Sequence, residues 1–390
     1  MSSGAAPRQG GEILERVRDL LPGIRAAAVE TERAGRLGDA LVESLKGAGV
    51  FGMAMPEAMG GAEADPMTQL EVVETLSVAD GSVGWVAMIG SDGGYYAAHL
   101  SEAAAEEIYA DREIVTASVL VPRGRALRVD GGYRVTGHWP FGSASLHADW
   151  FVGGCLVVGE DGAPLMGEAG HPIVRMTFFP ASACKVHDNW RTTGLAGSGS
   201  NDWSVEDVFV PEAHSFSLFE KARIDRPLYA YPWFIVANAP GVSLGLARAA
   251  IDELCTLAEK KVSLPGGSRL RDDLLVQRAV ALAEAELGSA RSYLYEATAA
   301  LFETVCAGRE PTLAERATYR LAGIHAFRAA KSAAGRMYEA GGGSALYASS
   351  PLDRIWRDVS TITQHAFANE RGYGEVGRAF LGLDPSSMMI

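Results

Sequence analysis

The sequence predicts an α+β fold built from three successive regions: an N-terminal helical domain (1–115), a middle β-domain (116–215) and a C-terminal helical bundle (216–390). Two changes in the repeat of apolar residues support this prediction. Up to Ile114 they recur at helical spacing, and beyond it Val, Thr, Trp and Phe alternate between glycine-containing turns, as strands do. After Pro211 the helical spacing returns. No polar low-complexity linker divides the chain, so we expect one packed subunit.

The N-terminal region carries the signals of several helices. Apolar residues in GEILERVRDLL follow helical spacing, and Pro22 is expected to start or kink a helix. Asp80-Gly81-Ser82 predicts a break between two further helices, and Ser101 is placed to cap EAAAEEIY.

The middle region predicts about seven or eight strands, which we expect to form a β-barrel-like domain. Asp130-Gly131-Gly132 predicts a tight turn, and GGYRVTGHW after it alternates as a half-buried strand does. In HWPFGSASLHADWF, we expect one face to carry alternate residues of the strand. These are Trp139, Phe141, Ser143 and Ser145.

The C-terminal region predicts a four-helix bundle. The stretch that ends at Val305 contains more than thirty residues without proline. As a helix it would span about 50 Å at about 1.5 Å per residue. Thr312 and Glu315 form a capping box for the next helix. We expect small residues on the long helix to permit close approach, often to another subunit: Ala279, Ala283, Ala290 and Ala297.

The last bundle helix carries the residues of greatest interest. The glycines 341–343 predict the end of one helix, and Ser349-Ser350-Pro351 predicts the start of another. Helical spacing would place Asp358 and His365 on one side of this helix, so that it presents a single imidazole.

Composition excludes several classes of function. A net charge of −13 and a pI near 5.2 argue against binding nucleic acid or anionic membranes, which need a cationic face. Four widely separated cysteines predict buried, reduced thiols and no metal site. The N-terminus lacks an apolar signal core, so we expect a cytoplasmic enzyme. The sequence contains neither GxGxxG between strand and helix nor a P-loop, and so predicts no nicotinamide site of those types.

The glycine run, the Arg357-Asp358 pair and the helix around them resemble the acyl-CoA dehydrogenase fold, as does Ala-Asp-Gly-Ser before a Trp near residue 80. In the dehydrogenases with a base on this helix, a glutamate follows the Asp by about eight residues. Here that position is Ala366, which cannot abstract a proton, and His365 precedes it. A histidine there resembles the two-component flavin-dependent monooxygenases of phenols, steroid-derived catechols and dibenzothiophene.

This resemblance implies reduced FMN or FAD from a separate, transiently bound flavin reductase, together with O₂. It implies that Ser143 hydrogen-bonds the flavin ring and that His365, with a pKa near neutrality, passes the proton that oxygen transfer requires. Ser143 and Ser145 remain alternatives for the side chain facing the ring. The implied cofactor-binding residues are Phe141, Ser143, Ser145, Trp190, Ser200, Arg269, Gly342 and Gly343.

Two of these assignments have competing interpretations. Arg269 either reaches the flavin of a neighbouring subunit or is a surface arginine. Gly342 and Gly343 either approach a flavin phosphate through backbone N–H groups or only close a helix. The resemblance also implies a homotetramer or homodimer.

For the substrate we expect an aromatic compound or natural product, with Tyr96, Trp139 and His147 lining its pocket. One alternative is an acyl-CoA dehydrogenase or oxidase that takes its base from Asp252 or Glu253. Another is an N-oxygenase of an amino sugar, and a third is a helical scaffold that has lost flavin binding.

Overall fold

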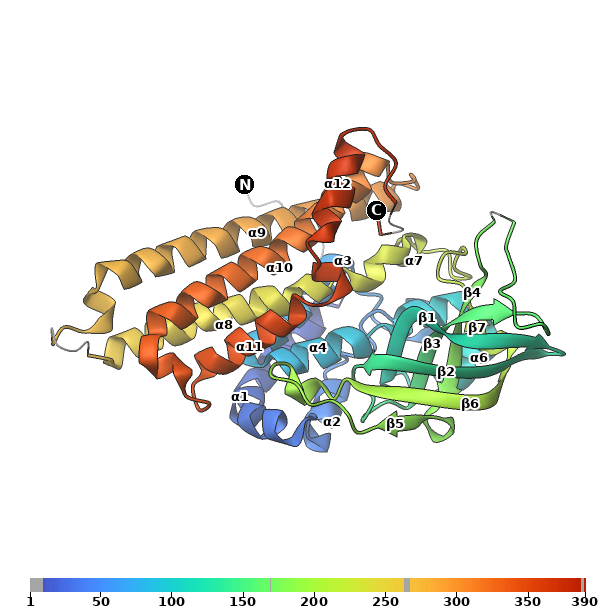
Figure 1. Cartoon of the computed structure of the whole chain (residues 1–390), viewed down its shortest axis with the longest axis horizontal. Helices are drawn as coiled ribbons and strands as arrows, with labels where there is room; N and C mark the ends of the chain where they lie inside the picture. The colour runs from blue at the N-terminus through green and yellow to red at the C-terminus, as the bar shows by residue number, and fades with distance from the viewer. Residues whose placement is uncertain (1–9, 169, 263–266, 387–388) are drawn as a thin grey trace.

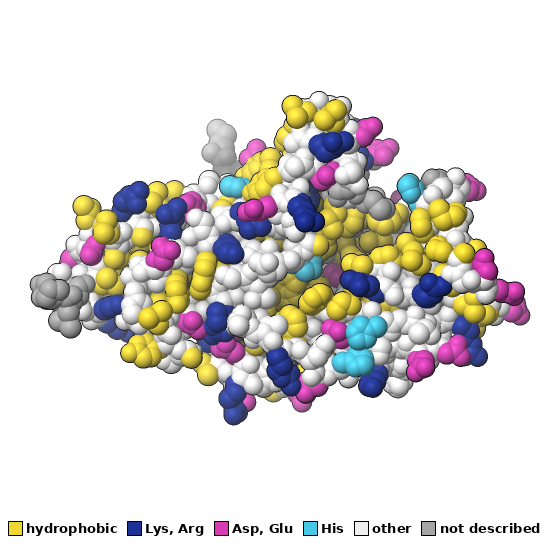
Figure 2. All heavy atoms as spheres, viewed as in Figure 1, with side chains coloured by type: hydrophobic (Ala, Val, Ile, Leu, Met, Phe, Trp, Pro, Cys, Tyr) yellow, Lys and Arg dark blue, Asp and Glu magenta, His cyan; other side chains and the backbone are white. Residues whose placement is uncertain are grey.

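A computed structural model describes residues 10–168, 170–262, 267–386 and 389–390. Figure 1 shows a long helical bundle on one side and a β-sheet on the other, with the N-terminal helices between and beneath them. In the space-filling view, hydrophobic side chains surround a hollow between α12 and the sheet (Figure 2). Helices, a sheet and further helices follow one another in the chain, which is the α+β order that the sequence predicted.

Six α-helices form the N-terminal part of the described chain: α1 (Gly11–Ala34), α2 (Asp39–Gly47), α3 (Pro66–Ala79), α4 (Gly81–Gly90), α5 (Gly93–His99) and α6 (Glu102–Ile108). Pro22 lies inside α1 and does not end it. Asp80 caps α4 by accepting hydrogen bonds from the N–H groups of Ser82 and Val83. Ser101 caps α6 by accepting from the Ala104 N–H, as predicted.

Seven strands of the described chain form one sheet in the order β5-β6-β2-β1-β3-β4-β7. They are β1 (Thr116–Val129), β2 (Gly132–Gly142), β3 (Trp150–Val158), β4 (Val174–Pro180), β5 (Lys185–His187), β6 (Asn201–Pro211) and β7 (Ser215–Phe216). β1 and β3 pair in parallel, and the other neighbours pair antiparallel. The β2–β6 ladder shifts register between Trp139 and Gly142, which interrupts the alternation expected there.

The C-terminal part comprises α7 (Pro227–Ala230), α8 (Ala239–Lys260), α9 (Leu274–Cys306), α10 (Leu313–Gly341), α11 (Pro351–Ile362) and α12 (Arg371–Phe380). The capping box of Thr312 and Glu315 starts α10. Ala283, Ala290 and Ala297 are buried within the chain's own bundle, so they do not offer the subunit contact expected of them.

Two further expectations need correction. α11 ends at Ile362, so His365 lies on the turn after this helix and immediately before the 3₁₀ turn η8 (Ala366–Ala368). Cys255 and Cys306 are exposed rather than buried, although all four cysteines are free. In the described chain, Pro232–Lys260 is the one helical segment long and apolar enough to cross a membrane, and 89% of its most apolar window is buried in the protein.

Candidate active site

The indole of Trp85 on α4 joins two groups that are far apart in the sequence. Its Nε1–H donates a hydrogen bond of 2.8 Å to Ser143 Oγ, which comes from the connection between β2 and β3. Its ring meets the imidazole of His365 edge-to-face, with centroids 5.3 Å apart and planes at 74°. A hydroxyl from the sheet region and an imidazole from the turn after α11 therefore flank the same side chain.

Ser143 belongs to a chain of hydroxyls whose direction can be deduced. Ser198 Oγ donates to the Leu195 carbonyl at 2.7 Å, so its one proton is committed. Ser200 Oγ, 2.8 Å away, must then donate to Ser198, and Ser143 Oγ, at 2.7 Å, must donate to Ser200. Since Ser143 also accepts from Trp85, its oxygen keeps one free lone pair. Ser143 is thus poised to accept a further hydrogen bond, not to donate one.

Strained backbone gathers around this chain. The described residues include five non-glycine residues with positive φ, and three of them are Phe141 (64°), Ala144 (64°) and Leu195 (52°). Such conformations are uncommon, and they concentrate at functional sites where the surrounding structure holds them. Here the Ala144 N–H donates to Ser198 O, which ties the two loops together.

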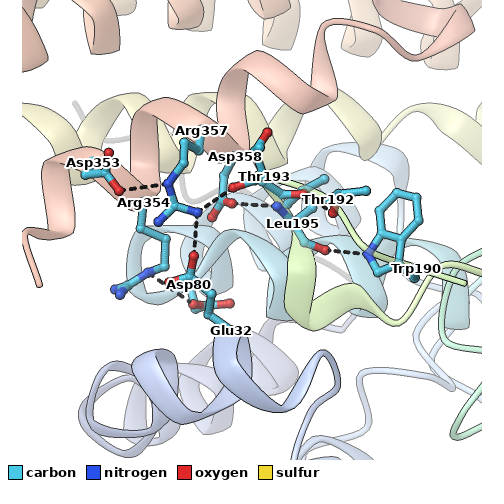
Figure 3. Close-up of polar contacts among 11 residues, drawn as sticks. Glu32, Asp80, Trp190, Thr192, Thr193, Leu195, Asp353, Arg354, Arg357 and Asp358 are labelled. Carbon is cyan, nitrogen blue, oxygen red and sulfur yellow. Dashed lines mark hydrogen bonds and ion pairs between the residues drawn. The ribbon is translucent and has the colours of Figure 1, made fainter. Parts of the chain in front are cut away.

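Helix α11 holds the loop that carries Ser198 and Ser200, and Figure 3 shows the contacts between them. Asp358 Oδ1 accepts a 2.6 Å hydrogen bond from the Leu195 N–H. Arg357 donates to Thr193 O and to the carboxylates of Glu32 and Asp353. The Arg-Asp pair noted in the sequence therefore anchors the loop of Ser198 and Ser200 to the same helix that leads to His365.

The contact between this loop and α11 is close. A Cβ on Gly194 would lie 2.2 Å from the Arg357 carbonyl oxygen, so glycine is required at this point. Trp190 supports the loop from the other side, since its Nε1–H donates to Leu195 O at 3.0 Å. Its ring meets the exposed ring of Phe141 edge-to-face, with centroids 6.4 Å apart.

The network of Figure 3 contains two buried carboxyl groups, those of Asp80 and Asp358, which influence each other electrostatically. Burial, together with the nearby charge of Asp80, raises the pKa of Asp358 to about 8, although the Leu195 N–H and the charges of Arg354 and Arg357 oppose this. Burial also raises the pKa of Asp80 to about 6, although Arg354 opposes this. Since both cannot be charged at low cost, we expect Asp358 to hold a proton at neutral pH.

The imidazole of His365 is held neutral. Burial, assisted by the charge of Arg320, lowers its pKa to about 4, well below the near-neutral value expected from the sequence. The Phe367 N–H donates to Nδ1 at 3.4 Å, so the proton of the neutral ring lies on Nε2. His365 therefore presents an N–H donor at neutral pH.

Three cations of α10 hold the turn that carries His365. Arg320 Nη1 donates to Phe367 O at 2.8 Å, and Arg328 Nη2 donates to Ala368 O at 3.1 Å. Lys331 Nζ donates to Thr363 Oγ1 at 3.1 Å. These contacts could not be predicted from the sequence, because Arg320 and Phe367 are 47 residues apart.

Two residues predicted to line the substrate pocket are instead packed in cores. Trp139 has no exposed surface, stacks on Trp203 with centroids 4.2 Å apart, and donates to Gly154 O. The register shift after it turns Phe141 outward to 67% exposure, so these two residues do not share a face. Tyr96 has no exposed surface either and packs against Phe178. Both side chains therefore pack against aromatic neighbours within the chain.

His147 and Ser145 also have other partners. His147 Nδ1 lies 3.5 Å from Nη2 of Arg36, which is on the connection between α1 and α2. Burial lowers the pKa of His147 to about 4. Ser145 Oγ donates to Gly199 O at 2.9 Å, which commits its proton to the loop.

Arg269, Gly342 and Gly343 lie at the opposite end of the bundle from His365. α10 runs 21 residues from Arg320, which contacts the His365 turn, to Gly341, a distance of roughly 30 Å at about 1.5 Å per residue. Arg269 pairs with Val262 in an isolated β-bridge, and the neighbouring Lys261 donates to Gly341 O. These residues therefore cannot touch a ligand held by Ser143 and His365 of the same chain.

The residues present fit a flavin ring. A buried hydroxyl with a free lone pair, a neutral imidazole with an N–H donor, and an exposed phenylalanine ring supply an acceptor, a donor and a flat apolar surface. The sequence prediction missed Trp85, which joins these groups. Its signal was the Ala-Asp-Gly-Ser motif just before it, which the prediction used only for the fold.

The chain resembles known proteins over nearly its whole length. The family model "Acyl-CoA dehydrogenase, N-terminal domain" matches residues 11–110, and "Acyl-CoA dehydrogenase, C-terminal domain" matches residues 238–370. The chain is 35% identical over 375 residues to the indole-3-acetate monooxygenase of Pseudomonas putida, covering 96% of this chain and 93% of that protein.

Two further matches extend this result. The flavin-dependent monooxygenase, oxygenase subunit HsaA, of Rhodococcus jostii is 30% identical over 393 residues, covering 97% of this chain and all of that protein (100%). The solved structure of XiaF from Streptomyces sp. in complex with FADH2 and glycerol is similar with a TM-score of 0.90 and 28% identity, covering 97% of each chain.

Proposed function

The chain belongs to the acyl-CoA dehydrogenase family, in its branch of flavin-dependent monooxygenases, and from this premise we propose that it is the oxygenase component of a two-component system. It takes reduced flavin from a separate reductase and uses O₂ to hydroxylate an aromatic substrate. The observation that carries the proposal is the indole of Trp85, which touches both Ser143 and His365.

Each side chain of the site has a role in this reaction. Bound reduced flavin supplies the two electrons that activate O₂. The free lone pair of Ser143 would accept a hydrogen bond from an N–H of the flavin ring and so keep that proton on the ring. The Nε2–H of His365 would donate a hydrogen bond to oxygen and so hold it in place, because a neutral imidazole donates this hydrogen bond without giving up the proton. Phe141 and Trp190 exclude water from one side of the ring.

The names of the relatives support the partner and the cofactor. A protein named as an oxygenase subunit implies a second component that reduces the flavin. The structure of XiaF contains FADH2, which supports FAD as the flavin of this chain. FMN is the alternative. We place the enzyme in the cytoplasm, where NADH-dependent reductases supply reduced flavin.

A subunit contact at the far end of the bundle fits the position of Arg269 and Gly342. Four large apolar side chains near them are between 68% and 75% exposed: Leu274, Leu275, Leu346 and Tyr347. Exposed apolar side chains that gather in one patch mark interaction sites, and these four lie close to Arg269 and Gly342 in the sequence. We propose a homodimer or homotetramer in which the end of the bundle that carries Arg269 meets the flavin site of another copy. Arg269 would bind the phosphate of that flavin.

The dehydrogenase alternative is less well supported. Ala366 offers no base, and Asp252 on α8 is paired with Arg248 at 3.0 Å with a side chain 58% exposed. In the described chain, the contacts of Ser143 and His365 include no carboxylate. An amino-sugar N-oxygenase would need polar groups for the sugar, whereas the groups around His365 are aromatic.

The test combines the protein, an independent flavin reductase, NADH, FMN or FAD, and a panel of phenols, indoles and amino sugars. We expect a product heavier by one oxygen atom from an aromatic compound. His365→Ala should keep the fold and flavin binding but divert most of the oxygen consumed to hydrogen peroxide. Unchanged coupling in this variant would contradict the role of the imidazole, and a purified protein that binds neither flavin would contradict the proposal.

A further inference from the structure

A small cavity lies beside the His365 turn. It holds about 30 Å³, enough for roughly two water molecules or one carboxylate group but not for an aromatic ring. Its walls are mostly apolar and include Trp233, Phe327 and Phe367. The Phe367 ring lies 4.8 Å from the His365 imidazole, so the cavity adjoins the candidate active site.

Arg320 is the one charged residue among the described residues that line this cavity. It is half-buried, and burial lowers the pKa of its guanidinium. The part of the chain that the structure describes offers it no carboxylate, in contrast to Arg328 and Arg336 on the same helix, which pair with Glu370 and Glu286. A partly desolvated cation without a counter-ion is costly, which points to an anion that binds there.

Arg320 has donors to spare. Its bonds to Phe367 O and Ala366 O use one N–H each of Nη1 and Nη2, and a guanidinium carries five N–H groups. Two polar groups near Arg320, outside the lining of the cavity, also lack partners among the described residues: Nε of Arg316, one turn earlier on α10, and Oη of Tyr231. Tyr231 lies within the electrostatic reach of both arginines. The spare N–H groups of Arg320 only donate, so they are complementary to a carboxylate, which only accepts.

We propose that this cavity binds the anionic arm of the substrate, so that the enzyme acts on an aromatic ring carrying a short carboxylate side chain. Arg320 pairs with the carboxylate while the ring lies outside the cavity, toward His365. Phe367, which lies between the cavity and the imidazole, sets the distance between the two. This inference rests on the proposed monooxygenase function and names its substrate class.

The test compares indole-3-acetate with indole-3-acetamide, which has nearly the same shape but no charge. Binding to the flavin-free protein is measured by calorimetry, and turnover with the reductase gives KM for each compound. We expect the wild type to bind the acid at least about tenfold more tightly than the amide, since charge-assisted hydrogen bonds discriminate by this order. Arg320→Gln should weaken binding of the acid about 10- to 100-fold and leave the amide within about twofold.

Arg328→Gln is the matched control, because Arg328 also holds the His365 turn but does not line the cavity. It should leave the acid-to-amide ratio unchanged. Arg320→Lys keeps the charge without the planar fork and should give an intermediate ratio. Thermal melting of each variant shows whether the fold is retained.

The outcomes separate the two proposals. Equal binding of acid and amide by the wild type, no binding of either, or equal weakening of both by Arg320→Gln would overturn the anionic subsite. If the enzyme still oxygenates neutral indole in that case, the proposed function stands. If reduced flavin is consumed with every aromatic compound and no oxygen enters a product, the proposed function itself fails.

Discussion

Replacing Asp358 by asparagine tests the buried network that links α11 to the active-site loop. Asp358 is 3% exposed, and burial raises the pKa of its carboxyl group to about 8. In the unfolded chain the same group has an ordinary pKa of about 3.9. At neutral pH the folded protein therefore binds one proton that the unfolded chain does not.

The sign of the pH dependence follows from this difference. A carboxyl group with a raised pKa stabilises the fold fully at low pH and loses this contribution as the pH rises through its folded pKa. For a folded pKa of about 8, the free energy of unfolding should fall by about 1 kcal/mol between about pH 7 and about pH 8. Asparagine keeps an oxygen for the Leu195 N–H but binds no proton, so this part of the fall should disappear.

Urea unfolding followed by tryptophan fluorescence at both pH values measures the effect. Burial also raises the pKa of Glu113 to about 7, but Glu113 titrates in both proteins and cancels in the comparison. Asp353→Asn is the control, because Asp353 lies on the same helix and is paired with Arg357. If Asp358→Asn loses as much stability over this interval as the wild type does, the assignment of the buried proton is wrong.

Three further predictions concern the site and its support. Trp85→Phe removes the donor to Ser143 and should raise the hydrogen peroxide yield several-fold at unchanged flavin affinity; an unchanged yield would exclude a positioning role for Trp85. Trp139→Ala should lower the free energy of unfolding in urea by roughly 3–5 kcal/mol, because the Trp139 side chain is fully buried. A loss below about 1 kcal/mol would contradict its place in the sheet core. Because the pKa of His365 is lowered to about 4, its contribution to stability and to coupling should be constant above about pH 6.5 and be lost as the pH falls toward 4. A coupling profile with a midpoint near pH 7 that is absent from His365→Ala would contradict the neutral imidazole.

The sequence determined the order of the three regions and the chemistry of the last turn. Periodicity and capping signals are local, so the change to strands near Ile114 and the capping box at Thr312 could be read from neighbouring residues alone. Ala366 beside His365 separated the oxygenase from the dehydrogenase for the same reason, since it depends on which side chain occupies one position.

Only the tertiary structure decided how the site is assembled. The register shift after Trp139 reversed the faces of that residue and Phe141, because pairing with β6 and not the alternation of the strand fixes which side is buried. The end of α11 before His365, the meeting of Trp85 with Ser143, and the unpaired charge of Arg320 all depend on contacts between distant segments. Burial also set the protonation of His365 and Asp358, since desolvation depends on everything packed around a group and not on its neighbours in the chain.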